Sequence, residues 1–111
     1  MEISEWFEKY YQKTGEKFRL LPNYTLLINR EYGFVTFRIC KDILWINQSS
    51  NVSKYWLPIL NSIAKTNGCK YLKAPTTHNP KMFARLFKAK CEYEYTAKDG
   101  RKHYIFSKEV E

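Results

Sequence analysis

Apolar residues recur at helical spacing near the start of the chain, and the spacing becomes alternating after residue 17. The first pattern predicts an amphipathic helix over residues 4–14. Ser4 is a suitable N-cap, Gly15 suits the C-terminal end, and Glu5 and Lys9 are one turn apart. We interpret the apolar stripe as core, and it consists of Ile3, Trp6, Phe7, Tyr10 and Tyr11.

The alternating part predicts short strands separated by turn residues. These strands are expected at residues 24–28, 34–40 and 43–47. Their close spacing favours an antiparallel meander, because parallel neighbours need a long crossover. A further short strand is expected at residues 71–74, where Pro75 would end it.

A second helix is expected between these strands. Asn51 or Ser53 can cap it, and it should begin near Lys54 or later, because Pro58 is tolerated only in a first turn. The helix should end at about Thr66, before an Asn-Gly pair.

The last part of the chain predicts a hairpin. Residues 91–96 alternate between polar and apolar, and Asp99 with Gly100 is a strong signal for a two-residue turn. In that register the numbers of opposite residues add up to 199, so Tyr95 would face Tyr104. One face of the hairpin would then carry four aromatic residues, namely Tyr93, Tyr95, Tyr104 and Phe106.

This order of elements predicts a single α+β domain over residues 1–111. Its centre would be a mixed, mostly antiparallel sheet with flanking helices, in which the strands beginning at Ile43 and Tyr71 are parallel. Ligands of such sheets often bind where the carboxyl end of a strand meets the next helix, here at residues 48–53.

Composition excludes several classes of protein. Hydrophobic residues make up 44% of the chain and aromatic residues 17%, which argues against disorder. The longest apolar run covers residues 43–46, far short of the roughly 20 residues that a membrane-spanning helix needs. Glu2 and Glu5 make the first residues acidic, unlike a signal peptide. We therefore expect a soluble, cytoplasmic protein with no membrane partner.

The cysteines agree with a reducing compartment. Cys40, Cys69 and Cys91 are odd in number, and none belongs to a CxxC pair. We expect three buried thiols and no metal site.

The net charge of +8 is unevenly distributed. Residues 43–91 contain eight basic and no acidic residues, whereas the rest of the chain contains eleven of each. A last helix is expected over residues 79–90, with Pro80 in its first turn. Such clustering is typical of a surface that binds an anion. The candidate polyanion-binding residues are Lys54, Lys73, Lys81, Arg85 and Lys88.

From about residue 24 to residue 106, the order of elements resembles the GCN5-related N-acetyltransferase (GNAT) family with its first strand missing. Residues 79–91, NPKMFARLFKAKC, are similar to the family's late motif. The resemblance implies acetyl-coenzyme A between the fourth and fifth strands, with its pyrophosphate on a glycine-rich turn before the central helix. Small phage-encoded proteins have a similar reduced appearance, which implies a phage origin.

Two departures from the family affect its chemistry. Residues 50–56 contain no glycine, and Val52 and Tyr55 would hinder close approach of a phosphate. Phe87 stands where the family often has a tyrosine acid, and it has no hydroxyl. The candidates for holding a cofactor or phosphate are Ser50, Asn51, Ser53 and Lys54.

Other acid–base chemistry would have to use Glu31, Asp42, His78 or His103. None of them lies in a spacing diagnostic of a nucleophile with its base, so no catalytic residue is assigned.

Three hypotheses follow. The first is a non-catalytic, cofactor-free, GNAT-like binding protein, phage-encoded and acting in the host cytoplasm or the virion. It would engage nucleic acid, or a host complex for nucleic-acid handling or defence, through residues 43–91, or act in virion assembly. The second is an acetyl-coenzyme A-dependent N-acyltransferase with a non-standard cofactor loop. The third is an assembly subunit whose aromatic surface packs on a partner protein.

Overall fold

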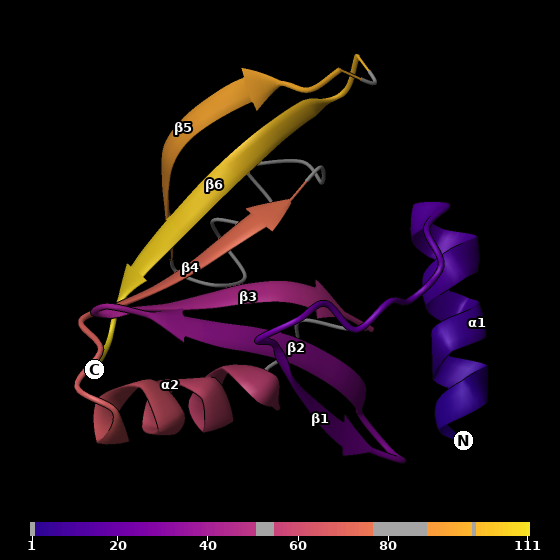
Figure 1. The fold of residues 1–111 in the computed structure, drawn as a ribbon, viewed down its shortest axis with the longest axis horizontal. Coiled ribbons are helices and arrows are strands. Elements are labelled where there is room, and N and C mark those ends of the chain that lie inside the picture. Colours follow the sequence, from indigo (N-terminus) through magenta and orange to yellow (C-terminus); the bar gives the residue numbers. More distant parts are fainter. Residues whose placement is uncertain (1, 51–54, 77–88, 99) are drawn as a thin grey trace.

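The computed structural model describes residues 2–50, 55–76, 89–98 and 100–111. These residues form two helices and six strands (Figure 1). The helices are α1 (Ile3–Thr14) and α2 (Trp56–Thr66). The strands are β1 (Thr25–Asn29), β2 (Gly33–Cys40), β3 (Ile43–Ser49), β4 (Tyr71–Thr76), β5 (Lys90–Thr96) and β6 (Lys102–Glu109). The last predicted helix lies almost entirely outside the described residues.

All six strands belong to one sheet in the order β1-β2-β3-β4-β6-β5. Strands β3 and β4 are parallel, and every other neighbouring pair is antiparallel. The predicted mixed, mostly antiparallel sheet is therefore confirmed, including the parallel strands that begin at Ile43 and Tyr71.

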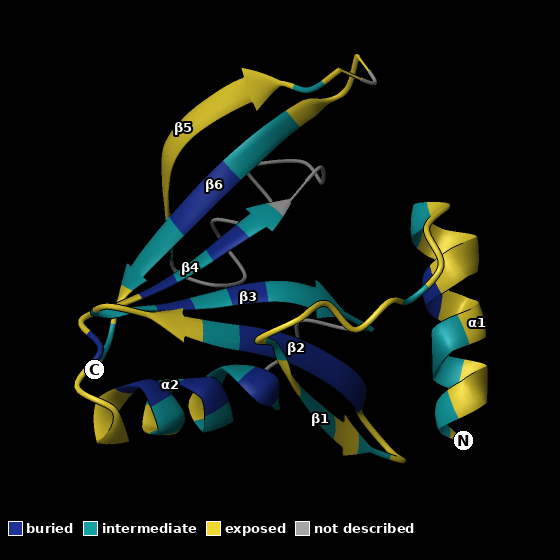
Figure 2. Cartoon of the chain, in the orientation of Figure 1, coloured by how far each residue is buried: buried dark blue, intermediate teal, exposed yellow. Residues whose placement is uncertain are grey.

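The two helices pack on opposite faces of the sheet. Strand β2 contributes to both cores, because its neighbouring residues point to opposite faces. Val35 and Phe37 join the larger core under α2, whose centre includes Leu44, Leu60 and Phe106. Figure 2 shows the buried stripe of α2 turned toward the sheet. On the other face, Phe34 is fully buried. It makes edge-to-face contacts with three rings from α1 and the segment after it, Phe7, Tyr10 and Phe18.

Helix α1 begins one residue earlier than predicted, with Glu2 rather than Ser4 as its N-cap. The Glu5 side chain reaches back and accepts a hydrogen bond from the Glu2 backbone N–H, at 3.4 Å. A carboxylate in the first turn also interacts favourably with the helix dipole. The predicted end is confirmed, because Gly15 has a φ of 76° and its N–H donates to the Tyr11 carbonyl at 2.8 Å.

The start of α2 agrees with the constraint from Pro58, which lies in the first turn of the helix. The predicted end of β4 is wrong, because β4 continues through Pro75 to Thr76. Pro75 pairs with Ile105 of β6, whereas β4 pairs with β3 only as far as Lys73. From there one side of β4 has no described neighbouring strand, and a proline nitrogen on an open side costs no ladder hydrogen bond.

The predicted hairpin is confirmed, but the register predicted for it is wrong by one residue. Residue numbers of opposite partners near the turn add up to 198, as in Tyr95 opposite His103. The turn is longer than two residues: the Gly100 N–H donates to the Ala97 carbonyl, and the Ala97 N–H to the Arg101 carbonyl. Gly100 has a φ of 81°, the left-handed conformation of a three-residue hairpin loop.

This shift separates the aromatic residues that were expected on one face. Phe106 and Tyr104 belong to the core under α2, whereas Tyr93 and Tyr95 are exposed. A one-residue slip reverses every side chain of a strand relative to its neighbour, which explains the whole difference.

Of the three cysteines, only Cys69 is buried, so the expectation of three buried thiols is wrong for Cys40 and Cys91. Burial, with a smaller contribution from the negative charge of Asp42, raises the pKa of the Cys69 thiol.

The aromatic cluster around Phe34 generates a first prediction. Phe34→Ala should lower the free energy of unfolding by about 3–5 kcal/mol, because it leaves a cavity between α1 and the sheet. Tyr11→Ala is the control, since Tyr11 is an exposed aromatic residue of α1, and the change should cost less than about 0.5 kcal/mol. Urea unfolding followed by tryptophan fluorescence measures both, and equal losses would contradict the role of Phe34.

Candidate anion-binding site

Strands β3 and β4 stay paired over only three residue pairs, from Ile43 opposite Tyr71 to Trp45 opposite Lys73. Both strands continue beyond this point, and Figure 1 shows them diverging toward their carboxyl ends. Strand β4 stays paired with β6 along its whole length, so the sheet separates between β3 and β4.

An extra residue in β3 lies close to this divergence. Phe37 is opposite Ile46 and Val35 is opposite Ser49, so two steps along β2 match three along β3. Such a bulge bends a strand and shifts its alternation by one residue. The fully buried Thr36 hydroxyl stabilises it, because it accepts a hydrogen bond from the Gln48 backbone N–H at 2.9 Å.

The bulge also connects β3 to the segment that follows α1. The Gln48 side-chain amide donates to the Arg19 carbonyl at 2.6 Å and accepts from the Arg19 N–H at 3.2 Å. Gln48 thus binds both backbone groups of Arg19, as a neighbouring strand would. This contact fixes the entry of the chain from α1 into the sheet.

Ser50, a predicted phosphate ligand, is engaged by β2. Its Oγ accepts a hydrogen bond from the Phe34 N–H at 2.9 Å and lies 3.3 Å from the carbonyl oxygens of Tyr32 and Phe34. Gly33 makes room for this arrangement, since a Cβ there would collide with the Ser50 side chain and approach Trp6. The other candidates for holding a cofactor phosphate, Asn51, Ser53 and Lys54, lie outside the described residues.

Bulky aromatic residues anchor the start of α2. The ring of Tyr55, the N-cap, stacks on Tyr32 with centroids 4.0 Å apart, and its hydroxyl accepts a hydrogen bond from Asn29 at 3.1 Å. The Trp56 indole N–H donates to the Tyr32 carbonyl at 3.3 Å. The described residues on both sides of the expected cofactor turn are therefore attached to β1, to β2 or to the turn between them. They do not fit the open, glycine-lined cradle that the GNAT resemblance implies.

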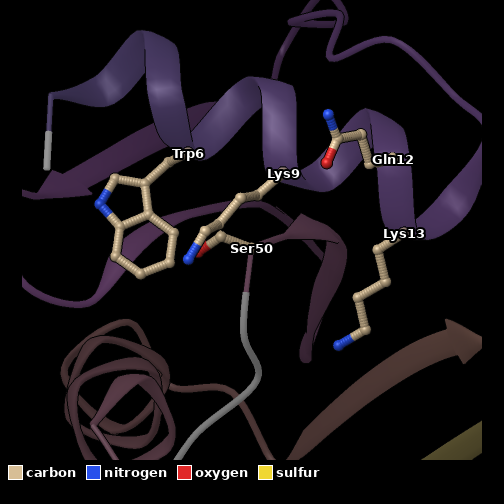
Figure 3. Close-up of a pocket in the computed structure, with 5 residues that line it drawn as sticks. All are labelled: Trp6, Lys9, Gln12, Lys13 and Ser50. Atoms are coloured by element: carbon tan, nitrogen blue, oxygen red, sulfur yellow. The ribbon is translucent and has the colours of Figure 1, made fainter.

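A pocket of about 470 Å³ lies between α1 and the end of β3. The described residues that line it are Trp6, Lys9, Gln12, Lys13 and Ser50, and none of these five is acidic. Figure 3 shows Trp6, Lys9 and Lys13 extending from α1 to the side on which Ser50 lies. Lys9 Nζ is 5.5 Å from the centre of the Trp6 ring, within range of a cation–π interaction. The Trp6 indole N–H donates to the Arg30 carbonyl at 2.8 Å, which fixes the ring.

This pocket was not predicted from the sequence, in which we interpreted Trp6 as a core residue and Lys9 as a partner for Glu5. The available signal was the spacing of Trp6, Lys9 and Lys13, which places all three on one face of a helix.

Among the predicted polyanion-binding residues, only Lys73 is described; Lys54, Lys81, Arg85 and Lys88 are not. Lys73 Nζ contacts both carboxylate oxygens of Glu92, at 2.9 and 3.0 Å. It also lies 6.0 Å from the centre of the Trp45 ring and 5.7 Å from that of Tyr71, and its side chain is only 16% exposed. The charge of Lys73 is thus matched within the chain.

The candidate acid–base residues are not brought together. Glu31 lies in the β1–β2 turn, and Asp42 lies in the β2–β3 turn at the other end of β2. His103 lies in β6, opposite Tyr95, and His78 is outside the described residues. Strands β3 and β4, which border the divergence, contain no Asp, Glu or His.

Among the described residues, no three His, Cys, Asp or Glu side chains are grouped as a metal ion would require. Neither of the described helices is long and apolar enough to cross a membrane.

No protein-family model matches the sequence, and no curated protein matches it either. The ribosomal-protein-S18-alanine N-acetyltransferase of Escherichia coli superimposes with a TM-score of 0.63 at 12% identity, over 99% of this chain and 90% of that one. The chain has a GNAT-like fold.

Two other solved structures agree with this GNAT-like fold. A protein of the GNAT family assigned as an acetyltransferase, from Desulfovibrio desulfuricans, gives a TM-score of 0.58 at 15% identity, over 72% of this chain and 62% of that one. A protein assigned as an acetyltransferase, from Agrobacterium tumefaciens, gives a TM-score of 0.56 at 14% identity, over 78% of this chain and 72% of that one. At these identities the likeness shows the fold alone, and it confirms the resemblance stated from the sequence.

The bulge generates a second prediction. Thr36→Val keeps the side-chain shape but removes the hydroxyl, so the Gln48 N–H loses its partner, and the free energy of unfolding should fall by about 1–3 kcal/mol. Thr36→Ser keeps a hydroxyl and should lose less. Thr25→Val, at an exposed position of β1, is the control. Chemical denaturation measures all three, and a fully stable Thr36→Val protein would show that the bulge does not need the hydroxyl.

Proposed function

We propose that this protein is a non-catalytic GNAT-like protein that binds nucleic acid as a polyanion. The observation that carries the proposal is the pocket between α1 and β3, where Lys9 lies beside the Trp6 ring, Lys13 also lines the pocket, and none of the described lining residues is acidic. Two lysines one turn apart suit neighbouring phosphates, and a fixed indole suits a base or sugar.

The pocket adjoins the basic segment in the sequence. Ser50, which lines the pocket, belongs to residues 43–91, which contain eight basic and no acidic residues. Basic side chains that follow Ser50 in the sequence are therefore candidates to extend the binding surface that the α1 lysines begin. Lys54, Lys81, Arg85 and Lys88 remain proposed contacts, whereas Lys73, which is paired with Glu92, is a weaker candidate.

The setting that we propose is a phage protein acting on a host nucleic-acid-handling or defence complex, or in virion assembly.

Three observations favour binding over acyl transfer. Tyr55 and Ser50, at the two sides of the expected cofactor turn, are engaged by β1, β2 and the turn between them. The strands bordering the divergence contain no Asp, Glu or His that could act as a general base. Phe87 cannot donate a proton to a leaving thiolate.

The polyanion proposal predicts a loss of binding in a double variant. Lys9→Ala with Lys13→Ala should weaken binding to unrelated DNA sequences alike. It should also reduce the slope of log affinity against log salt by about 0.7–0.9 per lost contact. Titration of fluorescent DNA at several salt concentrations measures both.

A charge-matched control is Lys65→Ala with Lys70→Ala, two exposed lysines that are not among the proposed contacts and that line a different pocket, beyond the C-terminal end of α2. This variant should bind nearly as the unmodified protein does. Equal weakening by both double variants would mean that only the net charge matters. No binding by the unmodified protein at low salt would overturn the proposed function.

Acyl transfer is the second candidate, because β3 and β4 diverge, and with the first strand missing these correspond to the fourth and fifth strands between which the GNAT resemblance would place acetyl-coenzyme A. Here we expect no release of coenzyme A thiol from acetyl-coenzyme A above an enzyme-free control, across a panel of amines and the amino-terminal alanine peptides of ribosomal proteins. Steady release with any acceptor would replace the proposal with this candidate.

A further inference from the structure

The β5–β6 hairpin has an aromatic surface on the sheet face opposite α2. Tyr93 and Tyr95 are 54% and 45% exposed, and they alternate with glutamates along β5. Their cross-strand neighbours are Ile105 and His103. The Tyr95 and His103 rings are stacked, with centroids 5.2 Å apart and planes 15° apart, and the Tyr93 ring lies 6.4 Å from Tyr95. We call Tyr93, Tyr95 and His103 the ring face.

The fold itself does not account for this exposure. Strand β6 of the same hairpin already supplies buried apolar side chains, since Ile105 and Phe106 are only 5% and 1% exposed. The hairpin therefore does not need Tyr93 and Tyr95 to attach it to the rest of the fold. Strand β5 is exposed along its whole length at the edge of the sheet (Figure 2). Single exposed aromatic residues are ordinary, but two exposed tyrosines beside the half-buried ring of His103 form an aromatic patch of the kind found at interaction surfaces.

The charges around the ring face suit an anionic partner. Lys98, Arg101 and Lys102 are exposed at the hairpin tip, where three basic residues and Asp99 give residues 98–102 a net charge of +2. The two glutamates of β5 do not cancel this positive charge at the ring face. Glu92 is paired with Lys73, and Glu94 is opposite Tyr104, which packs toward the α2 core on the other face.

We propose that the ring face is a stacking platform for unpaired bases, so that the preferred nucleic acid is single-stranded. This inference rests on the proposed function and adds a specificity that the lysines of α1 cannot supply. Flat rings bind the faces of bases, and those faces are available in a single strand but covered by neighbouring bases within a duplex. The basic tip would hold the backbone that connects the stacked bases.

The test compares two double variants of the full chain. Tyr93→Leu with Tyr95→Leu keeps apolar side chains on β5 but removes the rings, and Tyr93→Phe with Tyr95→Phe keeps the rings. For the leucine variant we expect affinity for single-stranded DNA to fall about tenfold or more, with affinity for duplex DNA of the same length unchanged. The phenylalanine variant should bind both as the unmodified protein does. Tyr11→Leu, an exposed tyrosine of α1, is the control.

The outcomes separate the two proposals. Absence of any DNA binding by the unmodified protein overturns the proposed function and the ring face together. Binding that is lost in the α1 lysine variant but unchanged in the leucine variant leaves the proposed function standing and overturns the ring face as a base platform. Equal losses for single-stranded and duplex DNA, or a loss in the phenylalanine variant, also overturn it. Thermal unfolding confirms that each variant is folded.

Discussion

The sheet must accommodate one extra residue in β3, and the buried hydroxyl of Thr36 stabilises the bulge that this residue forms. Its bond to the Gln48 N–H satisfies a backbone group that the bulge removes from the ladder. Three features follow from the resulting shift in alternation. Gln48 can bind Arg19, Ser50 can reach the backbone of β2, and β3 bends next to the place where it leaves β4. The pocket beside α1 exists because these contacts bring the end of β3 under that helix.

Much of the fold could be predicted from the sequence, because it depends on patterns that act locally. The helical stripe of α1, the first-turn position of Pro58 and the single crossover between β3 and β4 each have one physical explanation. The hairpin register could not be predicted, because Asp99 with Gly100 suits both a two-residue turn and a longer one ending in a left-handed glycine. The choice depends on how β6 packs in the core, where Phe106 must point toward α2.

The candidate site was predicted less well, for a related reason. Lys73 belongs to a basic segment in the sequence, but its partner Glu92 is 19 residues away and meets it only through the order β4-β6-β5. Lys9 and Trp6 seemed to belong to an ordinary amphipathic helix, and only the position of Ser50 makes their face a pocket. Charge counted along a chain does not reveal which charges are neutralised in space.

The contact between Gly33 and Ser50 has a consequence for how this protein can change over evolution. A side chain at residue 33 would need both an unfavourable φ near 91° and the space that Ser50 and Trp6 occupy, so residue 33 stays glycine for as long as this arrangement of the backbone is kept. Ser50 is in turn a fixed point from which the chain leaves the sheet. Insertions and substitutions after it are therefore separated from the core by a hydrogen-bonded anchor. A lineage could alter what this connection binds while the sheet, the bulge and both helices stay as they are.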